Sequence, residues 1–249
     1  MKRTSLRALI PKPIKRALRR SQQACLRTVD HLFLDRLVTR LFFELLVRKT
    51  TNFAHCTWLG HRIWQNILDL WTIQETLAEI RPDLLIESGT NRGGSALFYA
   101  HLFDLMGSGR VLTVDLHKMH DIVHPRVDFL LGSSVSDAIV AKVRERAQAA
   151  RGPIMVILDS DHSENHVFGE MELYAPLVTP GSFLLVQDGV TDVLSMGRWD
   201  RPGPLPAIKR FLAGHPEFEV DHERCERFLI THHPLGWLRR LGVASSPDS

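Results

Sequence analysis

The sequence predicts an α/β fold built on a doubly wound, mostly parallel sheet of seven strands, with a helical N-terminal extension. Three observations support this prediction. Short apolar runs alternate with segments in which apolar residues recur every three or four positions. A glycine-bearing turn at 89–94 follows the first of these runs and leads into an apolar helical segment. Several of the runs end in an acid or a hydroxyl residue.

Apolar periodicity and turn residues place each element in order. Continuous apolar runs mark strands that are buried on both faces, whereas three- and four-residue steps mark amphipathic helices. The expected strands are 84–87, 110–115, 127–131, 154–158, 182–186, 218–220 and 227–231, the last two as a closing pair. The expected helices are 28–48, 64–80, 96–105, 136–150, 164–173 and 207–213. The buried apolar stripe expected on the first helix either caps the core or forms the seam of a homo-oligomer.

Length and composition predict one domain with a terminal extension. The chain has 249 residues, of which 44% are hydrophobic, enough for a sizeable core. We expect an extension over 1–50, a main domain over 51–240 and a disordered tail over 241–249. No apolar run approaches the roughly 20 residues that span a bilayer. The widely spaced Cys25, Cys56 and Cys225 provide no disulfide framework, which indicates a reducing compartment and a cytoplasmic protein.

The N-terminus is a basic arm on a mildly acidic body. Residues 1–29 hold nine of the 31 lysines and arginines and no acid, which leaves 22 basic against 28 acidic residues elsewhere. Apolar residues lie among these charges, so one reading is a peripheral contact with anionic lipid at the inner membrane face. An organellar transit peptide and a solvated or self-packing helix are the alternatives. The body carries no recognition motif for nucleic acid, and we expect no nucleic-acid partner.

Acids and hydroxyls stand at five of the predicted strand ends. The carboxyl ends of parallel strands share one edge of a sheet, and ligands bind at that edge. The sequence therefore predicts that five residues converge there although they are far apart in the chain. They are Glu87, Asp115, Ser133, Asp159 and Asp188.

The glycine turn and the second strand end predict a cofactor site. Asp115 stands 26 positions after Gly89, where an acid accepts both hydroxyls of a ribose. The turn lacks the G-x-G-x-x-G pattern, and Glu87 before it would repel a pyrophosphate. S-adenosylmethionine, which has a ribose, an adenine and an ammonium group but no phosphate, fits better. Glu87 would meet its amino end and Ser133 its adenine. The expected cofactor-binding residues are Glu87, Gly89, Thr90, Gly93, Ser95, Asp115, Ser133 and Asp159.

The last two parallel strand ends predict the chemistry. Asp159, Gln187 and Asp188 supply the carboxylate and amide oxygens that suit Mg²⁺. His162 is a candidate general base, because imidazole exchanges protons near neutral pH. The alternative is a histidine that only satisfies a hydrogen bond at a helix start. A zinc site from His162 and His166, four positions apart, is a weaker alternative because the H-E-x-x-H pattern is absent.

Residues 189–206 interrupt the alternation of strands and helices. They contain three glycines and three prolines with little periodicity. A long loop at this place, carrying Trp199, is expected to act as a lid or as a wall of the substrate site. Plain disorder is the alternative.

Several motifs together resemble a known family. They are Ile86-Glu87-Ser88-Gly89-Thr90 with Gly93-Gly94-Ser95, Ile157-Leu158-Asp159-Ser160-Asp161-His162, residues 172–178, and residues 203–212 with Gly203-Pro204, Ala207-Ile208-Lys209 and Phe211-Leu212. Over residues 58–231 the chain resembles the cephalosporin hydroxylase / rhamnosyl O-methyltransferase family. The resemblance implies a Rossmann-like class I methyltransferase fold that uses S-adenosylmethionine, often with Mg²⁺.

The same resemblance implies residue roles and an acceptor. The acid at Asp159 and an acidic pair after the next strand would hold the metal, and His162 would be the base. This chain departs from the pattern at Gln187, since a neutral amide replaces an acid there. The expected acceptor is a sugar hydroxyl of a glycoconjugate or a glycosylated natural product. A small non-sugar hydroxyl is one alternative. A catalytically weak or inactive cofactor-binding scaffold in cell-surface polysaccharide synthesis is another, and Gln187 favours it.

Overall fold

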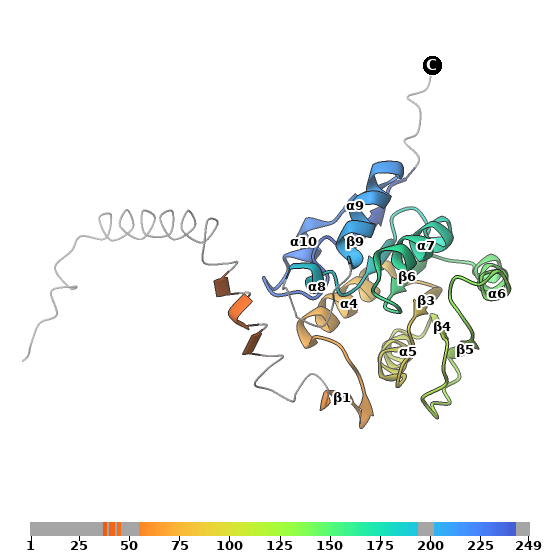
Figure 1. Cartoon of the computed structure of the whole chain (residues 1–249). Helices are drawn as coiled ribbons and strands as arrows, with labels where there is room; N and C mark the ends of the chain where they lie inside the picture. Colours follow the sequence, from red (N-terminus) through yellow and green to blue (C-terminus); the bar gives the residue numbers. More distant parts are fainter. Residues whose placement is uncertain (1–36, 39, 43, 46–54, 194–201, 243–249) are drawn as a thin grey trace, which may run out of the picture. The chain divides into compact units, whose positions relative to one another are not determined.

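The structure is a computed structural model of the chain (Figure 1). It describes residues 37–45 without 39 and 43, and residues 55–193 and 202–242. The chain divides into two compact units, Met1–Lys49 and Thr50–Ser249. Three features that we expected lie outside the described residues: the basic arm, the stretch of the 189–206 loop that carries Trp199, and residues 243–249 of the expected disordered tail 241–249. The start of that tail is described, and the Leu241 N–H donates to Glu217 O at 2.7 Å.

The first unit is helical where it is described, over part of residues 37–45. The apolar side chains there are exposed, among them Leu37, Val38 and Leu41. No described element of their own unit packs against these residues, so their burial, against the core or in the seam of a homo-oligomer, stays a prediction.

The second unit is built on the seven-stranded sheet that the sequence predicts. Its strand order is β5-β4-β3-β6-β7-β9-β8. The first five positions are parallel, and β9 runs antiparallel to both β7 and β8. The strands are β3 (Leu84–Ser88), β4 (Arg110–Asp115), β5 (Val127–Leu131), β6 (Ile154–Leu158), β7 (Phe183–Val186), β8 (Phe218–Val220) and β9 (Trp237–Arg240).

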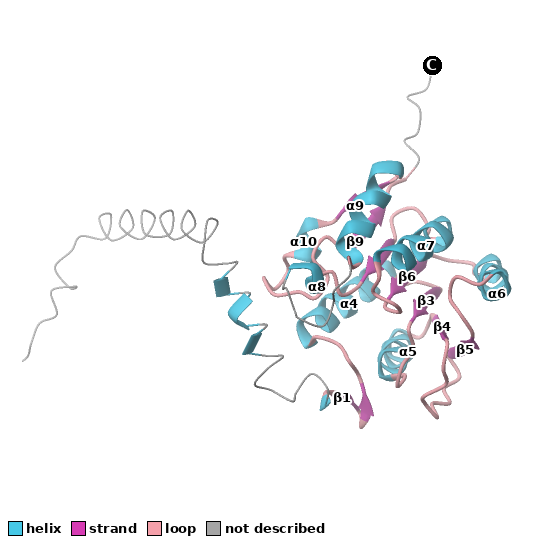
Figure 2. Cartoon of the chain, viewed as in Figure 1, coloured by secondary structure: helices cyan, strands magenta, loops and turns pink. Residues whose placement is uncertain are grey.

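Helices cover both faces of this sheet (Figures 1 and 2). One apolar cluster joins alternate strand residues such as Ile86 and Val156 to α6, α7 and α9, and the other joins Leu85 and Ile157 to α4 and α5. The helices are α4 (Ile67–Ile80), α5 (Gly94–Met106), α6 (Asp137–Ala149), α7 (Glu164–Tyr174), α8 (Val190–Val193), α9 (Pro204–Gly214) and α10 (His222–Cys225), with a 3-10 turn at Ala175–Leu177. Because strands buried on both faces carry apolar side chains in both directions, the central runs are continuously apolar.

The order in which strands are added to the sheet reverses at β3, although the strands there stay parallel. From β3 the chain continues to β4 on one side and later returns to β6 on the other. Ser88 pairs in register with both Val114 and Leu158, so the loops after β3, β4 and β6 begin side by side. This switch point is where ligands bind in doubly wound sheets.

The seventh strand that we predicted at 227–231 is wrong. That segment is a turn, in which Leu229 has a φ of 64° and Arg227 forms two hydrogen bonds to Glu75 of α4. The left-handed backbone of Leu229 interrupts the extended conformation that a strand requires. The seventh strand is instead β9, which lies between β7 and β8 and whose Trp237 and Leu238 are fully buried.

Smaller differences from the prediction concern residues 51–63 and residues 189–206. Residues 51–63 look irregular in sequence, yet they contain the two-residue strands β1 (Thr57–Trp58) and β2 (His61–Arg62). The 189–206 segment contributes α8, and α9 begins at Pro204, three residues earlier than predicted. Among the residues that the structure describes, we find no helix of the length and apolarity that crossing a bilayer requires.

Candidate active site

A pocket of about 620 Å³ opens at the carboxyl edge of the sheet. Loops form it, drawn pink in Figure 2, and they follow β3, β4, β5, β6 and β7. The pocket is lined by Trp64, Gly89, Asn91, Val114, Asp115, Leu116, His117, Met119, Gly132, Ser133, Ser134, Asp159, Ser160, Asp161, His162, His166 and Asp188. Asp115, Ser133, Asp159 and Asp188 thus meet, as the sequence predicts.

The glycine turn approaches the end of β6 too closely for any side chain. Gly89 has a φ of 92°, and a Cβ there would lie 1.9 Å from the carbonyl oxygen of Asp159. The Gly89 N–H donates to Val114 O at 2.8 Å, and the Asp159 N–H donates to Ser88 O at 2.9 Å. The turn therefore fixes the loops after β3, β4 and β6 relative to one another.

Glu87, the fifth strand-end residue, lies beneath the pocket and is 1% exposed. Its Oε2 accepts a hydrogen bond of 2.6 Å from Thr113, and the Thr113 hydroxyl in turn bonds to Thr90 at 2.6 Å. Burial raises the pKa of Glu87 to about 7, against the hydrogen bonds from Ser95 and Thr113 that lower it. Three expected cofactor residues, Glu87, Thr90 and Ser95, therefore form one buried polar network under the glycine turn.

The raised pKa of Glu87 makes stability depend on pH. The folded state holds the proton more tightly than the unfolded chain, whose carboxyl has a pKa near 4.5. This contribution is present below pH 4.5 and is lost as pH rises through about 7, at a cost of about 3 kcal/mol. We expect cofactor-free Glu87→Gln to lack that loss, so that its advantage over wild type in urea unfolding grows from pH 4.5 to pH 8. Glu145→Gln, at an exposed site on α6, should show the same dependence of the unfolding free energy on pH as wild type. The prediction would be contradicted if the unfolding free energies of all three proteins changed equally with pH.

Asp115 is held in place by the backbone of the pocket itself. Its Oδ2 accepts from the Asn91 N–H at 2.8 Å and its Oδ1 from the His117 N–H at 3.0 Å. Both oxygens keep further lone pairs for a ligand. The apolar Leu116 and Met119 line the same pocket and are 61% and 43% exposed. This side combines a fixed acid with apolar surface, which suits a ribose with an attached base.

The opposite side of the pocket gathers Asp159, His162 and Asp188. One ligand atom from each lies within 4.8 Å of the others, and His162 Nε2 is 3.4 Å from Asp188 Oδ2. Burial and the charge of Asp188 raise the pKa of Asp159 well above its usual value. Burial acts in the same direction on Asp188, but the neighbouring His232 and His162 outweigh it and lower its pKa to about 2. Two carboxylates this close repel each other unless a proton or a cation lies between them.

Gln187 is buried beside Asp159 together with a second amide. Gln65, which precedes α4, donates from Nε2 to Asp159 Oδ2 at 2.8 Å and to Gln187 Oε1 at 2.6 Å. In the other amide orientation of Gln187, its nitrogen donates to Asp159 at 2.9 Å. The Asp159 carboxylate is therefore supported by two neutral amides.

Sequence reasoning did not identify Gln65, His232 or His233. Nδ1 of His232 is 3.7 Å from Asp188 Oδ1, and Nδ1 of His233 accepts from the Asp188 N–H at 3.2 Å. Burial lowers the pKa of His233, so its neutral ring can accept that bond. The adjacent pair of histidines was a visible signal, but it follows the segment that was mistaken for a strand.

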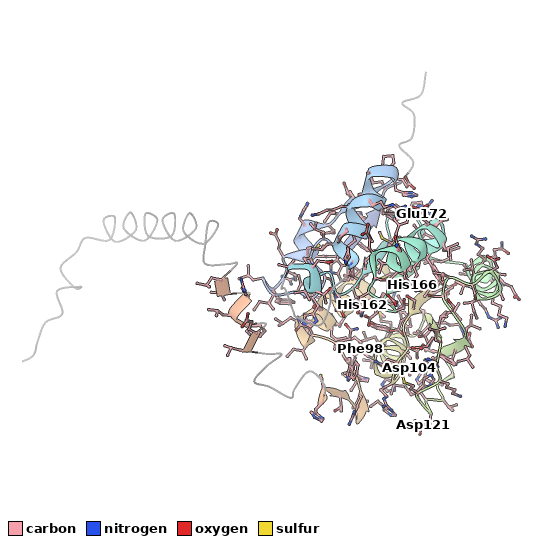
Figure 3. All side chains as sticks on the ribbon, in the orientation of Figure 1. Phe98, Asp104, Asp121, His162, His166 and Glu172 are labelled. Atoms are coloured by element: carbon pink, nitrogen blue, oxygen red, sulfur yellow. The ribbon has the colours of Figure 1, made fainter. Side chains whose placement is uncertain are left out.

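His162 and His166 come from the loop before α7 and from its first turn (Figure 3). His166 Nε2 lies 3.3 Å from Ser134 Oγ and 3.5 Å from Glu170 Oε1. In the described part of the chain, the group with metal-ligand spacing contains His162 and not His166. The zinc alternative is therefore not supported.

Sheet order, glycine turn and acidic edge together define the Rossmann-like methyltransferase class of fold. A model of the family described as rhamnosyl O-methyltransferase/CmcI matches residues 50–241. The chain belongs to this family, which confirms the resemblance seen in the sequence motifs.

Individual relatives agree with this assignment. The rhamnosyl O-methyltransferase of Mycobacterium tuberculosis is 37% identical over 192 residues, which cover 74% of this chain and 78% of the relative. That of Mycobacterium leprae is 36% identical over 189 residues, covering 74% and 82%. Among solved structures, CmcI in a form with Mg and SAM superposes with a TM-score of 0.61 at 20% identity, over 77% of this chain and 79% of that one. This structural likeness shows the shared fold.

Proposed function

We propose that this chain is an S-adenosylmethionine-dependent O-methyltransferase that acts on a sugar hydroxyl of a glycoconjugate or a glycosylated natural product. The observation that carries the proposal is one pocket with two chemically different sides. The glycine turn, Asp115 and Ser133 form one side, and Asp159, His162 and Asp188 form the other. The curated relatives at 36–37% identity are named rhamnosyl O-methyltransferases, which supports a sugar acceptor.

The first side fits S-adenosylmethionine by its donor set. Asp115 accepts the ribose hydroxyls, Leu116 and Met119 offer apolar surface to the adenine, and Ser133 lies at its polar edge. Glu87 supports this site from below through Thr113 and Thr90, and its ionised form favours the ammonium end of the ligand. Gly89, Gly93 and Ser95 complete the turn that faces the methionine part.

The second side fits Mg²⁺ through Asp159 and Asp188, with Gln187 beside them. The fit rests on two crowded carboxylates that call for a positive charge between them. S-adenosylmethionine supplies the methyl group, and Mg²⁺ supplies positive charge that lowers the pKa of a nearby hydroxyl. Trp64, which is 49% exposed, stands at the rim and restricts where an acceptor can lie.

His162 is the proposed general base. Its imidazole accepts the proton of the acceptor hydroxyl, while its Nε2 lies 3.4 Å from Asp188 Oδ2. Asp188 then stabilises the imidazolium that forms, because it stays ionised at neutral pH. The pocket holds the hydroxyl and the methyl donor next to each other, and this proximity supplies much of the acceleration.

The direct test is methyl transfer by the full-length protein. We expect label from methyl-labelled S-adenosylmethionine to appear on a hydroxyl of rhamnosides in a panel of glycosides, and not on a catechol control. Label on the catechol alone would show that the acceptor is a small non-sugar hydroxyl and not a sugar. Cofactor binding in calorimetry without turnover on any acceptor would favour the inactive scaffold, the alternative that Gln187 supports.

Gln187→Glu tests the metal side. The new carboxylate stands next to Asp159, where Gln65 can still donate to both groups. We expect Mg²⁺ to bind about tenfold more tightly, or ~1.4 kcal/mol, because a third negative charge then faces the cation besides Asp159 and Asp188. Calorimetric titration checks this. Gln65→Glu is a comparison at the same cluster, and unchanged affinity in Gln187→Glu would place the ion away from Asp159.

We further propose a peripheral contact of the N-terminal arm with anionic lipid at the inner face of the cell membrane of a cytoplasmic enzyme. The nine basic residues without an acid in 1–29 support it. A homo-oligomer formed through the apolar residues near 37–45 is likewise a proposal, supported by their exposure. The extension 1–50 would then be a separate element from the domain 51–240.

A further inference from the structure

A short segment behind the acidic side of the pocket contacts both ends of Asp188. Residues 231–233 connect the turn after α10 to β9. His232 faces the Asp188 carboxylate at 3.7 Å, and His233 accepts a hydrogen bond of 3.2 Å from the Asp188 N–H. The two histidines are 6% and 1% exposed. A single segment therefore contacts the side chain and the backbone of one proposed metal ligand.

Asp188 needs such support because of its backbone conformation. Its φ is 59°, in the left-handed region that costs conformational energy for a residue with a Cβ. Its carbonyl oxygen accepts from the Thr191 hydroxyl at 2.8 Å and from the Thr191 N–H at 3.1 Å. On its N–H side, the ring of His233 provides the acceptor. The conformation directs the carboxylate into the pocket beside Asp159 and His162.

A buried acid on α4 anchors this segment. Asp69 is 3% exposed and accepts from the Thr231 hydroxyl at 2.6 Å and from the His232 N–H at 2.8 Å. The Thr231 hydroxyl accepts in turn from the His233 N–H at 2.9 Å. The second ring nitrogen of His233 lies 3.7 Å from Asp69 Oδ2. Asp69 thus anchors the backbone of this segment through Thr231 and His232, and its carboxylate lies near the ring of His233.

We propose that His233, anchored through Thr231 by Asp69, is a positioning residue that holds Asp188 in the left-handed conformation needed for cation binding. His233 acts through the backbone of Asp188 and not by touching the acceptor or the cofactor. The inference rests on the proposed function in one respect, namely that Asp188 holds a cation. Groups that orient metal ligands contribute about 10–100-fold to metal affinity, and we expect an effect of this size from the acceptor nitrogen of His233.

The test compares two substitutions of His233 in the full-length protein with Mn²⁺ as the probe. His233→Asn keeps an acceptor at the position of Nδ1, since both atoms are bonded to Cγ. His233→Leu removes the acceptor and retains more of the volume. Mn²⁺ affinity is measured by electron paramagnetic resonance and fold stability by thermal unfolding. We expect the leucine variant to bind Mn²⁺ about 10–100-fold more weakly and the asparagine variant to bind within about threefold of wild type.

The two readouts separate positioning from packing. If both variants lost affinity in proportion to their loss of stability, or if neither lost affinity, the positioning role would be overturned. Should the leucine variant fail to fold, Thr231→Val removes the hydroxyl that links His233 to Asp69, and unchanged Mn²⁺ affinity there would overturn the proposal as well. A wild-type protein that binds no Mn²⁺ would overturn it together with the metal side of the proposed function, whereas the methyl-transfer assay judges the enzyme activity independently.

Discussion

His162→Ala is expected to lower kcat by about 10²–10⁴-fold, the usual contribution of a general base. The imidazole next to Asp188 is the proposed proton acceptor, and on this proposal alanine leaves the acceptor hydroxyl without a base. KM for S-adenosylmethionine should stay nearly unchanged, because the proposed cofactor site, at Asp115 and Ser133, is on the other side of the pocket. Steady-state methyl transfer with a rhamnoside measures both constants.

His222→Ala is the matched control for this substitution. His222 is exposed on α10 and is not among the pocket residues, so its loss should leave kcat as in wild type. A full rate in His162→Ala would show that His162 is not the base. A similar fall in both variants would point to a general effect of removing a histidine.

Gly89→Ala is expected to have the largest effect on stability. The φ of 92° costs a residue with a Cβ roughly 1–2 kcal/mol, and the Cβ would stand 1.9 Å from the Asp159 carbonyl oxygen. Overpacking adds roughly 1–3 kcal/mol and pushes apart the ends of β3 and β6. Denaturant unfolding measures the loss, and calorimetry with S-adenosylhomocysteine should show that the distorted turn no longer binds the cofactor.

Gly181→Ala separates the two causes of that loss. Gly181 has a similar φ of 85°, but a Cβ there would meet no atom within 4 Å. The Gly181→Ala variant should therefore lose only the stability that the left-handed φ costs, and it should bind the cofactor as wild type does. Equal losses of stability in the two variants would mean that the contact between Gly89 and Asp159 has no energetic role.

The sequence predicts the pocket because parallel strands end at a common edge. The runs before Asp159 and Gln187 are continuously apolar, as in strands covered on both faces, and the run before Asp115 is interrupted by Thr113, so the strand ends were placed to within a residue. The polar residue that follows each run then falls at the edge of the sheet. Local periodicity and one topological rule are sufficient for this part of the site.

Periodicity failed where long-range contacts decide the structure. Residues 227–231 have the composition of a strand, but Arg227 is tied to Glu75 of α4, 152 positions away, and Leu229 is left-handed. The strand β9 contains two arginines and gives a weak apolar signal, although Trp237 is fully buried. This error hid His232 and His233, since a closing hairpin at the edge of the sheet would not bring them to Asp188. Gln65 was missed for a related reason, because only the tertiary structure brings it to Asp159.

A crystal structure with S-adenosylhomocysteine and Mn²⁺ tests the central claim most directly, because anomalous scattering locates the ion. We predict the cofactor between the glycine turn, Asp115 and Ser133, and the ion on Asp159 and Asp188, with Asp188 still left-handed against His233. A cofactor bound elsewhere, or an ion bound away from both carboxylates, would contradict the claim that one edge of the sheet holds the methyl donor and the reacting hydroxyl.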